Sequence, residues 1–205
     1  MWLETSKVED LWQKVSIKNG VELKSFAEAA RSTATILDQV YGLGMARADM
    51  FGNVDTLLRW CVQRPYSSLD ELLVEEIANK DRSTVTARIG DKKTVACATL
   101  WLLRTLEFIR LMILSLCDDR ELSLTNCVKI AYAGSLSKHH NQIMRMAFSV
   151  GGRLIPDRMV LLQKLHGANE KKDLFPRLRK LEQDVRPIME HLNQLYMREN
   201  IVALH

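Results

Sequence analysis

Residues 49–53 read Asp-Met-Phe-Gly-Asn, within the longer stretch MARADMFGNVDTLLRW from Met45 to Trp60. On a helix, positions i and i+4 lie one above the other, so the carboxylate of Asp49 and the carboxamide of Asn53 would share a face. Apolar residues flank the pair, which predicts two polar groups emerging from an apolar surface. Such a pair suits a ligand with hydroxyls or an amide. An Asp/Asn pair on a helix is also common as a solvated face or a cap.

Around this stretch, almost every segment is patterned as helix. A capping-box pattern, Ser-x-x-Glu, occurs at Ser6, Ser25 and Ser68. An apolar run predicts a long central helix over about 92–117, capped by Asp91, and shorter helices are expected over about 125–136 and 140–150. No segment alternates with period 2, so we predict an all-α fold.

The composition indicates one domain. The chain has 205 residues, of which 47% are hydrophobic, and no Pro/Gly/Ser-rich linker interrupts it, so we expect a single domain over 1–205 with one core. The net charge of +4 suits contact with anionic membranes or nucleic acid but is too small to diagnose either.

The sequence also indicates an intracellular protein. The four cysteines form no C-x-x-C pair, which favours buried reduced thiols over disulfides or a zinc site. Residues 1–10 lack the pattern of a signal peptide. The apolar run 94–117 is interrupted by Arg104, Glu107 and Arg110, which predicts a buried helix rather than a membrane span. We therefore expect a cytoplasmic, cytosolic location.

Two later motifs give the first stretch its meaning. One is Trp101-Leu-x-Arg-x-Leu-x-Phe-Ile109, and the other is Lys138-His139-His140. Together with Asp49-x-x-x-Asn53, in this order and at this spacing, they resemble the glycolipid transfer protein family along most of the chain. The resemblance implies a two-layer helical fold that encloses an apolar lipid pocket. It also implies non-enzymatic carriage of one sphingolipid between membranes, through transient contact with their cytosolic surfaces, by a monomer without cofactor or metal.

The resemblance assigns roles to four residues. Trp101 would be a flat platform under a sugar, while Asp49 would accept the amide N–H of a ceramide and His140 would bond its carbonyl. Asn53 would help to hold the first head-group atoms. In the branch of the family that carries phosphate head groups, an arginine stands in place of Trp101 and a lysine in place of Asn53. Guanidinium suits phosphate and indole suits sugar, so we expect a glycosylceramide-type lipid.

The hydrocarbon chains of the lipid need an apolar tunnel, or sleeve, inside the protein. The resemblance implies this sleeve, whereas composition alone cannot distinguish it from a filled core. The residues that could line it lie on the central helix and after His140: Cys97, Leu100, Leu103, Leu106, Phe108, Leu111, Ile113, Leu114, Met144, Phe148 and Val150.

The sequence departs from the family pattern at two places. Thr56 stands where sugar-type members often carry a basic residue, with Arg59 one turn further on. Asn141 and Gln142 follow His140 where the family has an aromatic residue thought to dip into membranes. Arg104 fits either an ion pair with Glu107 or a head-group contact.

Several alternatives remain open from the residues themselves. Trp101 and the His139-His140 pair could be ordinary core or surface residues. Within the family, the protein could instead carry ceramide-1-phosphate or act as a sphingolipid sensor. A helical nucleic-acid-binding module is suggested only by the basic pI, without a compact basic recognition helix, so no nucleic-acid partner is expected. An enzyme could use Asp49 and His140, although no nucleophile motif accompanies them.

Overall fold

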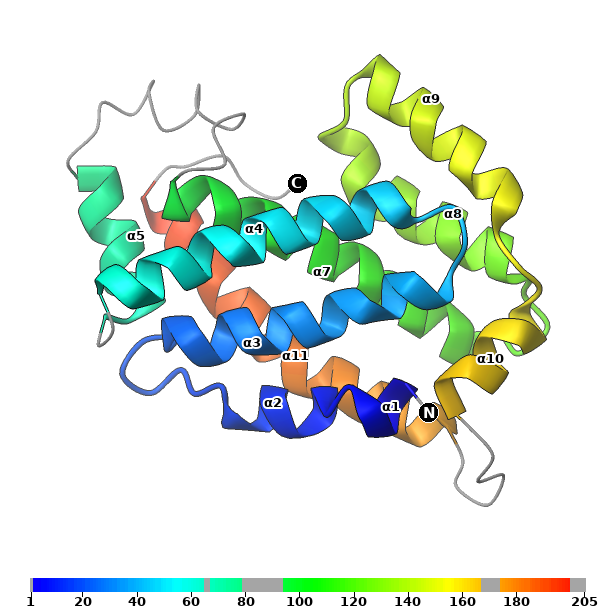
Figure 1. The fold of residues 1–205 in the computed structure, drawn as a ribbon, viewed down its shortest axis with the longest axis horizontal. Coiled ribbons are helices and arrows are strands. Elements are labelled where there is room, and N and C mark those ends of the chain that lie inside the picture. Colours follow the sequence, from blue (N-terminus) through cyan, green and yellow to red (C-terminus); the bar gives the residue numbers. More distant parts are fainter. Residues whose placement is uncertain (1, 65–66, 79–93, 167–173, 200–205) are drawn as a thin grey trace.

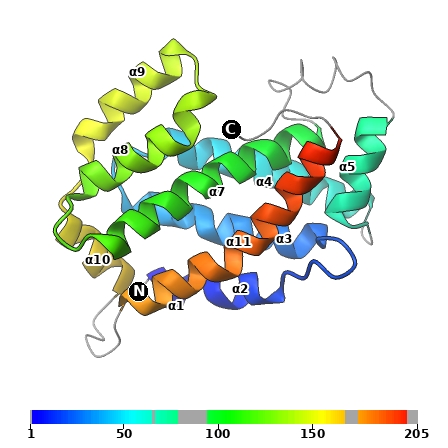
Figure 2. The same cartoon turned by 180° about the vertical axis from the view of Figure 1, so that it is seen from behind.

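The computed structural model describes residues 2–64, 67–78, 94–166 and 174–199, and every regular element within these ranges is a helix. The helices form two layers, as Figures 1 and 2 show from opposite sides. One layer contains α2 (Val8–Lys14), α3 (Leu23–Ala34) and α4 (Gly44–Gln63), and the other contains α7 (Val95–Asp118), α8 (Leu124–Gly134) and α11 (Leu174–Arg198). The prediction of an all-α, two-layer helical fold is confirmed.

Shorter elements complete the layers at their ends. They are α1 (Trp2–Thr5), η1 (Thr35–Gln39), α5 (Leu69–Ala78), η3 (Leu136–Lys138), α9 (Gln142–Gly151), η4 (Gly152–Leu154) and α10 (Arg158–His166). Among the residues that the structure describes, no helix combines the length and the apolarity needed to cross a bilayer.

The central helix is α7, which packs against α4 in the other layer and between α8 and α11 in its own. Most of its residues are buried, as expected of a helix that is apolar around most of its circumference. The expected central helix is therefore present, and its first turn is capped by Thr94, whose hydroxyl accepts a hydrogen bond from the Cys97 amide at 3.1 Å. The proposed cap Asp91 lies outside the described residues.

Only one of the three expected capping boxes forms. Ser68 and Glu71 exchange reciprocal hydrogen bonds of 3.0 and 3.1 Å at the start of α5. The predictions for Ser6 and Ser25 were wrong: the N-cap of α2 is Lys7, and Ser25 lies inside α3, which begins at Leu23. Tertiary contacts decide the start of α3, because Val21, just before it, is hydrogen-bonded through its backbone to the first turn of α5.

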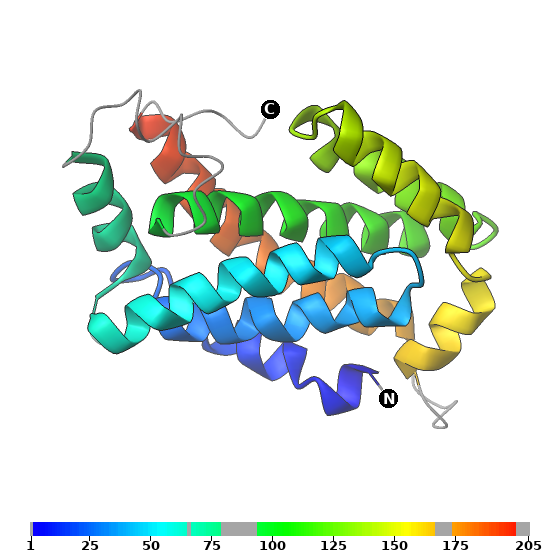
Figure 3. The same ribbon diagram turned by 45° about the horizontal axis from the view of Figure 1, so that its top comes forward.

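The helix α9 lies at one edge of the molecule, across α8 (Figure 3). None of its residues is fully buried. Its C-terminal end touches the loop before α4 through two glycines: a Cβ on Gly151 would lie 2.4 Å from the Gly42 carbonyl oxygen, and a Cβ on Gly42 only 2.0 Å from that of Gly151. Gly42 also has a φ of +90°, which favours glycine. This backbone contact therefore requires glycine on both sides.

Candidate functional site

A cavity of about 350 Å³ lies where α9 and the residues before it face α7 and the start of α4. Its wall brings together three of the four residues predicted from the sequence, Asp49, Trp101 and His140. The remaining wall residues are mainly apolar and come from α4, α7 and α9 and the loops beside them: Gly42, Leu43, Met45, Ala46, Thr105, Leu136, His139, Asn141, Met144, Ala147 and Phe148.

The fourth predicted residue, Asn53, supports the site from behind. Its Nδ2 donates a hydrogen bond to Asp49 Oδ2 at 3.1 Å, so the i, i+4 pair is formed as predicted. The expectation that both groups emerge at a surface was wrong for Asn53, which is wholly buried. It lies on the face of α4 that enters the core with Met50, Val54 and Leu57. Asn53 therefore orients the Asp49 carboxylate and does not itself line the cavity.

The basic side chain of Arg59 reaches the position that departs from the family pattern. Its Nη2 donates to the Thr56 hydroxyl at 2.9 Å, while Thr56 donates to the Gly52 carbonyl at 3.0 Å. Neither residue is part of the cavity wall.

Four aromatic side chains link the central helix to α8 and α9. The His140 and Trp101 rings are stacked with 6.1 Å between centroids and 27° between planes. The Tyr132 hydroxyl lies 3.1 Å from His140 Nδ1, and the Tyr132 ring stacks on Phe148 at 3.7 Å and 8°. The His140–Trp101 separation lies within the favoured range for aromatic pairs, and the Tyr132–His140 distance lies within the range for hydrogen bonds. They fix the imidazole against the cavity side of Trp101.

The electrostatics of this cluster determine its protonation. Burial lowers the pKa of His140, and the nearby cations Arg145 and Arg104 lower it further. Burial raises the pKa of Tyr132. At neutral pH the phenol is therefore protonated and the imidazole neutral. When the phenol donates to Nδ1, the imidazole proton lies on Nε2. That N–H is then available as a donor to a carbonyl oxygen.

Arg104 does not form the ion pair with Glu107 that was one of its two expected roles. Glu107 pairs with Arg110 instead, at 2.8 Å, and Arg104 lines a different cavity. Its guanidinium lies 4.8 Å from the Trp101 ring centroid, in a cation–π contact.

Sequence reasoning missed two residues of the site. Tyr132 lies on α8, and the break of that helix before η3 leaves no regular spacing that would connect it to His140. His139, treated as a neighbour without a role, lines the cavity as well. Val150 was wrongly assigned to the sleeve, because 62% of its surface is exposed. Met144 and Phe148, from the same prediction, do line the cavity.

An all-helical, two-layer fold around an apolar cavity that holds a few hydrogen-bonding groups fits the class of lipid-binding proteins. The chain belongs to the glycolipid transfer protein family, because the family model described as Glycolipid transfer protein (GLTP) matches residues 21–167. The resemblance inferred from the three motifs is thereby confirmed.

Relatives support the same family. The chain is 27% identical to Glycolipid transfer protein 2 of Arabidopsis thaliana over 69% of its own length and 57% of that protein. It is 26% identical to the Glycolipid transfer protein of Danio rerio over 81% of each chain.

Solved structures confirm the fold. The fungal glycolipid transfer protein HET-C2 superposes with a TM-score of 0.75 at 24% identity, covering 96% of this chain and 97% of that one. Human ceramide-1-phosphate transfer protein in complex with 12:0 ceramide-1-phosphate superposes with a TM-score of 0.82 at 18% identity, covering 98% of each chain.

Proposed function

We propose that the protein binds one sphingolipid and transfers it between membranes without covalent chemistry, and that this lipid is of the glycosylceramide type. The observation that carries the proposal is the wall of the cavity, where Asp49, Trp101 and His140 meet on an otherwise apolar lining. A carboxylate and an imidazole can form hydrogen bonds with an amide, and an indole ring can stack on a sugar, so the three groups suit the polar end of a glycosylceramide.

The amide of a ceramide would be held from two sides. The Asp49 carboxylate, oriented by Asn53, accepts the amide N–H, and Nε2–H of neutral His140 donates to the amide carbonyl. A lipid without the amide cannot form these two hydrogen bonds, and covering the two polar groups with such a lipid would cost about 1–3 kcal/mol for each. The pair would thus distinguish a sphingolipid from a diacylglycerol lipid.

The preference for a sugar over a phosphate head group is inferred from the side chains beside Asp49 and His140, which together form the amide clamp. The platform residue is an indole, and Trp101 is only partly buried, so part of its surface faces the cavity. The arginine closest to it, Arg104, lines the other cavity, and Arg59 is bound to Thr56 outside the wall. The described wall of the site therefore contains no arginine or lysine to neutralise a phosphate.

The chains of the lipid require the cavity to widen. Exposing two chains of about 16 carbons to water costs on the order of 20–25 kcal/mol, at about 0.8 kcal/mol per CH₂, so a carrier must cover most of their length. The observed 350 Å³ is near the lower end of the range of about 300–1,000 Å³ for ligand pockets. Because α9 contains no fully buried residue, it can move outward at a smaller cost than any helix of the core.

The outer face of α9 supports contact with membranes. Ile143, Met146 and Val150 on α9 are 76%, 64% and 62% exposed, and Leu154 at the end of η4 continues their line and is 64% exposed. We call these four residues the α9 ridge. On the opposite face, Met144 and Phe148 line the cavity. A helix that is apolar on both faces, with one in water, fits insertion into a bilayer surface. The ridge would replace the aromatic residue that is absent here, since Asn141 instead caps α9 by accepting from the Met144 amide at 2.9 Å.

The test is a vesicle-to-vesicle transfer assay with purified protein. Donor vesicles of phosphatidylcholine would contain galactosylceramide, glucosylceramide or ceramide-1-phosphate, with labelled phosphatidylcholine as the control cargo. Transfer of the sugar lipids alone supports the proposal. Transfer of ceramide-1-phosphate alone would overturn the sugar assignment and keep the clamp, whereas binding without transfer would indicate a sensor. Transfer of none, without binding, would overturn the proposed function.

A further inference from the structure

A second cavity, of about 260 Å³, lies on another side of α7, between that helix, the α8–η3 segment and α11. Its wall differs in kind from that of the first cavity, because it contains four basic side chains, Arg104, Arg110, Lys138 and Arg186, beside the carboxylates of Glu107 and Glu190. The two cavities share one wall residue, His139. The second cavity is therefore a separate polar space and not an extension of the lipid site.

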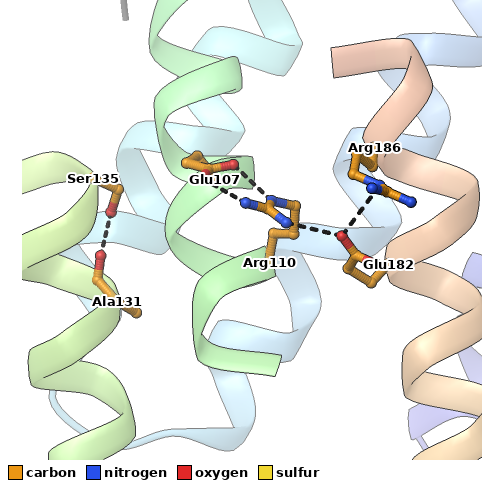
Figure 4. Close-up of polar contacts among 6 residues, drawn as sticks. All are labelled: Glu107, Arg110, Ala131, Ser135, Glu182 and Arg186. Atoms are coloured by element: carbon orange, nitrogen blue, oxygen red, sulfur yellow. Dashed lines mark hydrogen bonds and ion pairs between the residues drawn. The ribbon is translucent and has the colours of Figure 1, made fainter. Parts of the chain in front are cut away.

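Part of this charge is already neutralised by ion pairs, as Figure 4 shows. Arg110 pairs with Glu107 at 2.8 Å and with Glu182 at 2.8 Å, and Arg186 lies 3.7 Å from the same Glu182 carboxylate. The hydrogen bonds that Arg110 donates to Glu107 are the main reason why the pKa of Arg110 is raised. Glu107 and Glu182 are consequently committed to Arg110 and Arg186.

Arg104 is left without such a partner. It is 3% exposed, its Nε has no hydrogen-bond acceptor, and within the described ranges no carboxylate forms an ion pair with it. Burial lowers its pKa to about 10, which still leaves it protonated at neutral pH. Lys138, at the exposed side of the cavity, also forms no ion pair with any described residue. A buried cation without an anion is costly, and the contact with the Trp101 ring compensates only part of that cost.

We propose that the second cavity binds a phosphate group, with Arg104 as its central ligand and Lys138 at its rim. The planar guanidinium presents several N–H donors in a fork that matches two oxygens of a tetrahedral oxyanion, and the ammonium of Lys138 adds a flexible second charge. Glu190 is the wall carboxylate that has no ion pair among the described residues, so it must turn toward solvent when the anion enters. This proposal does not rest on the sphingolipid function proposed above, and its central ligand Arg104 also contacts the Trp101 ring.

The experiment measures the thermal stability of the 205-residue chain in sodium phosphate and in sodium chloride at equal ionic strength and pH 7.5. Ligand that binds only the folded state raises the Tm in a saturable way. The wild type is expected to show this rise in phosphate. Arg104→Gln is expected to lose it, while its Tm in chloride equals or exceeds that of the wild type, because the change removes a buried charge that no described carboxylate neutralises. That second property shows that the variant folds.

Two further variants sharpen the test. Lys138→Gln removes an exposed charge and should raise the half-saturating phosphate concentration several-fold. Lys24→Gln makes the same change in charge on α3, where Lys24 is exposed and lies 3.9 Å from Glu28, and should leave the response unchanged. The proposal is wrong if phosphate stabilises the wild type no more than chloride does, or if the Arg104→Gln protein responds as the wild type does.

The phosphate group could belong to a soluble molecule or to a lipid head group. Sedimentation with phosphatidylcholine vesicles that contain phosphatidic acid separates these sources. If the head group is bound, the Arg104→Gln protein sediments less than the wild type and free phosphate competes. If soluble phosphate alone is bound, the two proteins sediment equally, and the difference between them is confined to the thermal measurement. Neither arm uses sugar-lipid transfer, so failure of the proposed function would not affect the result.

Discussion

The imidazole of His140 is held between two aromatic side chains, stacked on Trp101 with 6.1 Å between centroids and hydrogen-bonded to the Tyr132 hydroxyl at 3.1 Å through Nδ1. This arrangement fixes the orientation of the imidazole. In the tautomer in which the Tyr132 hydroxyl donates to Nδ1, the Nε2–H group can donate a hydrogen bond to a lipid carbonyl.

Replacing Trp101 by alanine is expected to abolish sugar-lipid transfer and leave the fold intact, because the side chain is only partly buried. We expect a loss of stability of about 1–2 kcal/mol. Vesicle transfer and thermal unfolding measure the two effects. Trp60→Ala, on α4 and away from the cavity wall, is the matched control and should retain transfer. Unchanged transfer by the Trp101→Ala protein would rule out the platform.

Replacing Asp49 by valine is expected to prevent uptake of every lipid that carries the amide. The change also leaves the buried Nδ2 of Asn53 without its acceptor, so stability should fall by about 1–3 kcal/mol. Asp49→Asn retains an acceptor oxygen and lacks only the charge, so it should weaken uptake without abolishing it. Full uptake of ceramide lipids by the valine variant would contradict the clamp.

Acidification is expected to destabilise the folded protein through His140. Burial and two nearby arginines lower its folded pKa from the ordinary value of 6.5, so the unfolded chain takes up a proton first. The contribution of a neutral His140 is thus fully present above pH 6.5 and is lost as the pH falls from there toward the lowered pKa. Thermal unfolding at pH 7.5 and 5.5 should show a smaller loss for His140→Gln than for the wild type. Equal losses of stability in the two proteins would mean that folding does not lower the pKa of His140.

Replacing Ile143 by glutamate is expected to weaken adsorption to phosphatidylcholine vesicles and to slow transfer. The side chain is 76% exposed, so the folded state should be affected by less than about 0.5 kcal/mol. Binding of a short-chain, water-soluble glycosylceramide should remain unchanged, since the residue is outside the cavity wall. Val62→Glu is a control at an equally exposed position on α4. If both variants adsorb as the wild type does, the α9 ridge is not the contact surface.

Much of the fold could be predicted from the sequence, because most helices here are marked by strong local signals. The apolar run of α7 and the reciprocal capping box at Ser68 are examples. The starts of α2 and α3 could not be predicted in the same way. At Val21, contacts with residues nearly 50 positions away hold the backbone, and these override the local preference for a serine cap.

Most residues of the candidate site could be predicted from the sequence, but their orientations could not. The i, i+4 spacing correctly paired Asp49 with Asn53, yet which of them faces the cavity depends on how α4 is rotated against α7. Spacing alone also left the partner of Glu107 undecided, because Arg104 and Arg110 each lie three residues from it on the same helix. In the structure, Arg110 forms this ion pair. Tyr132 could be assigned only once the path of the chain through η3 was known.

The contact between Gly42 and Gly151 requires glycine at the C-terminal end of α9. The packing of the core restricts the other positions of this helix only weakly, because none of its side chains is fully buried. Substitutions along α9 therefore change the lipid cavity and the outer surface with little effect on the free energy of unfolding. Within this fold, that wall can diverge in evolution while the two layers that carry the stability stay the same. A search for altered lipid preference should thus randomise residues 143–150 before any position of α7.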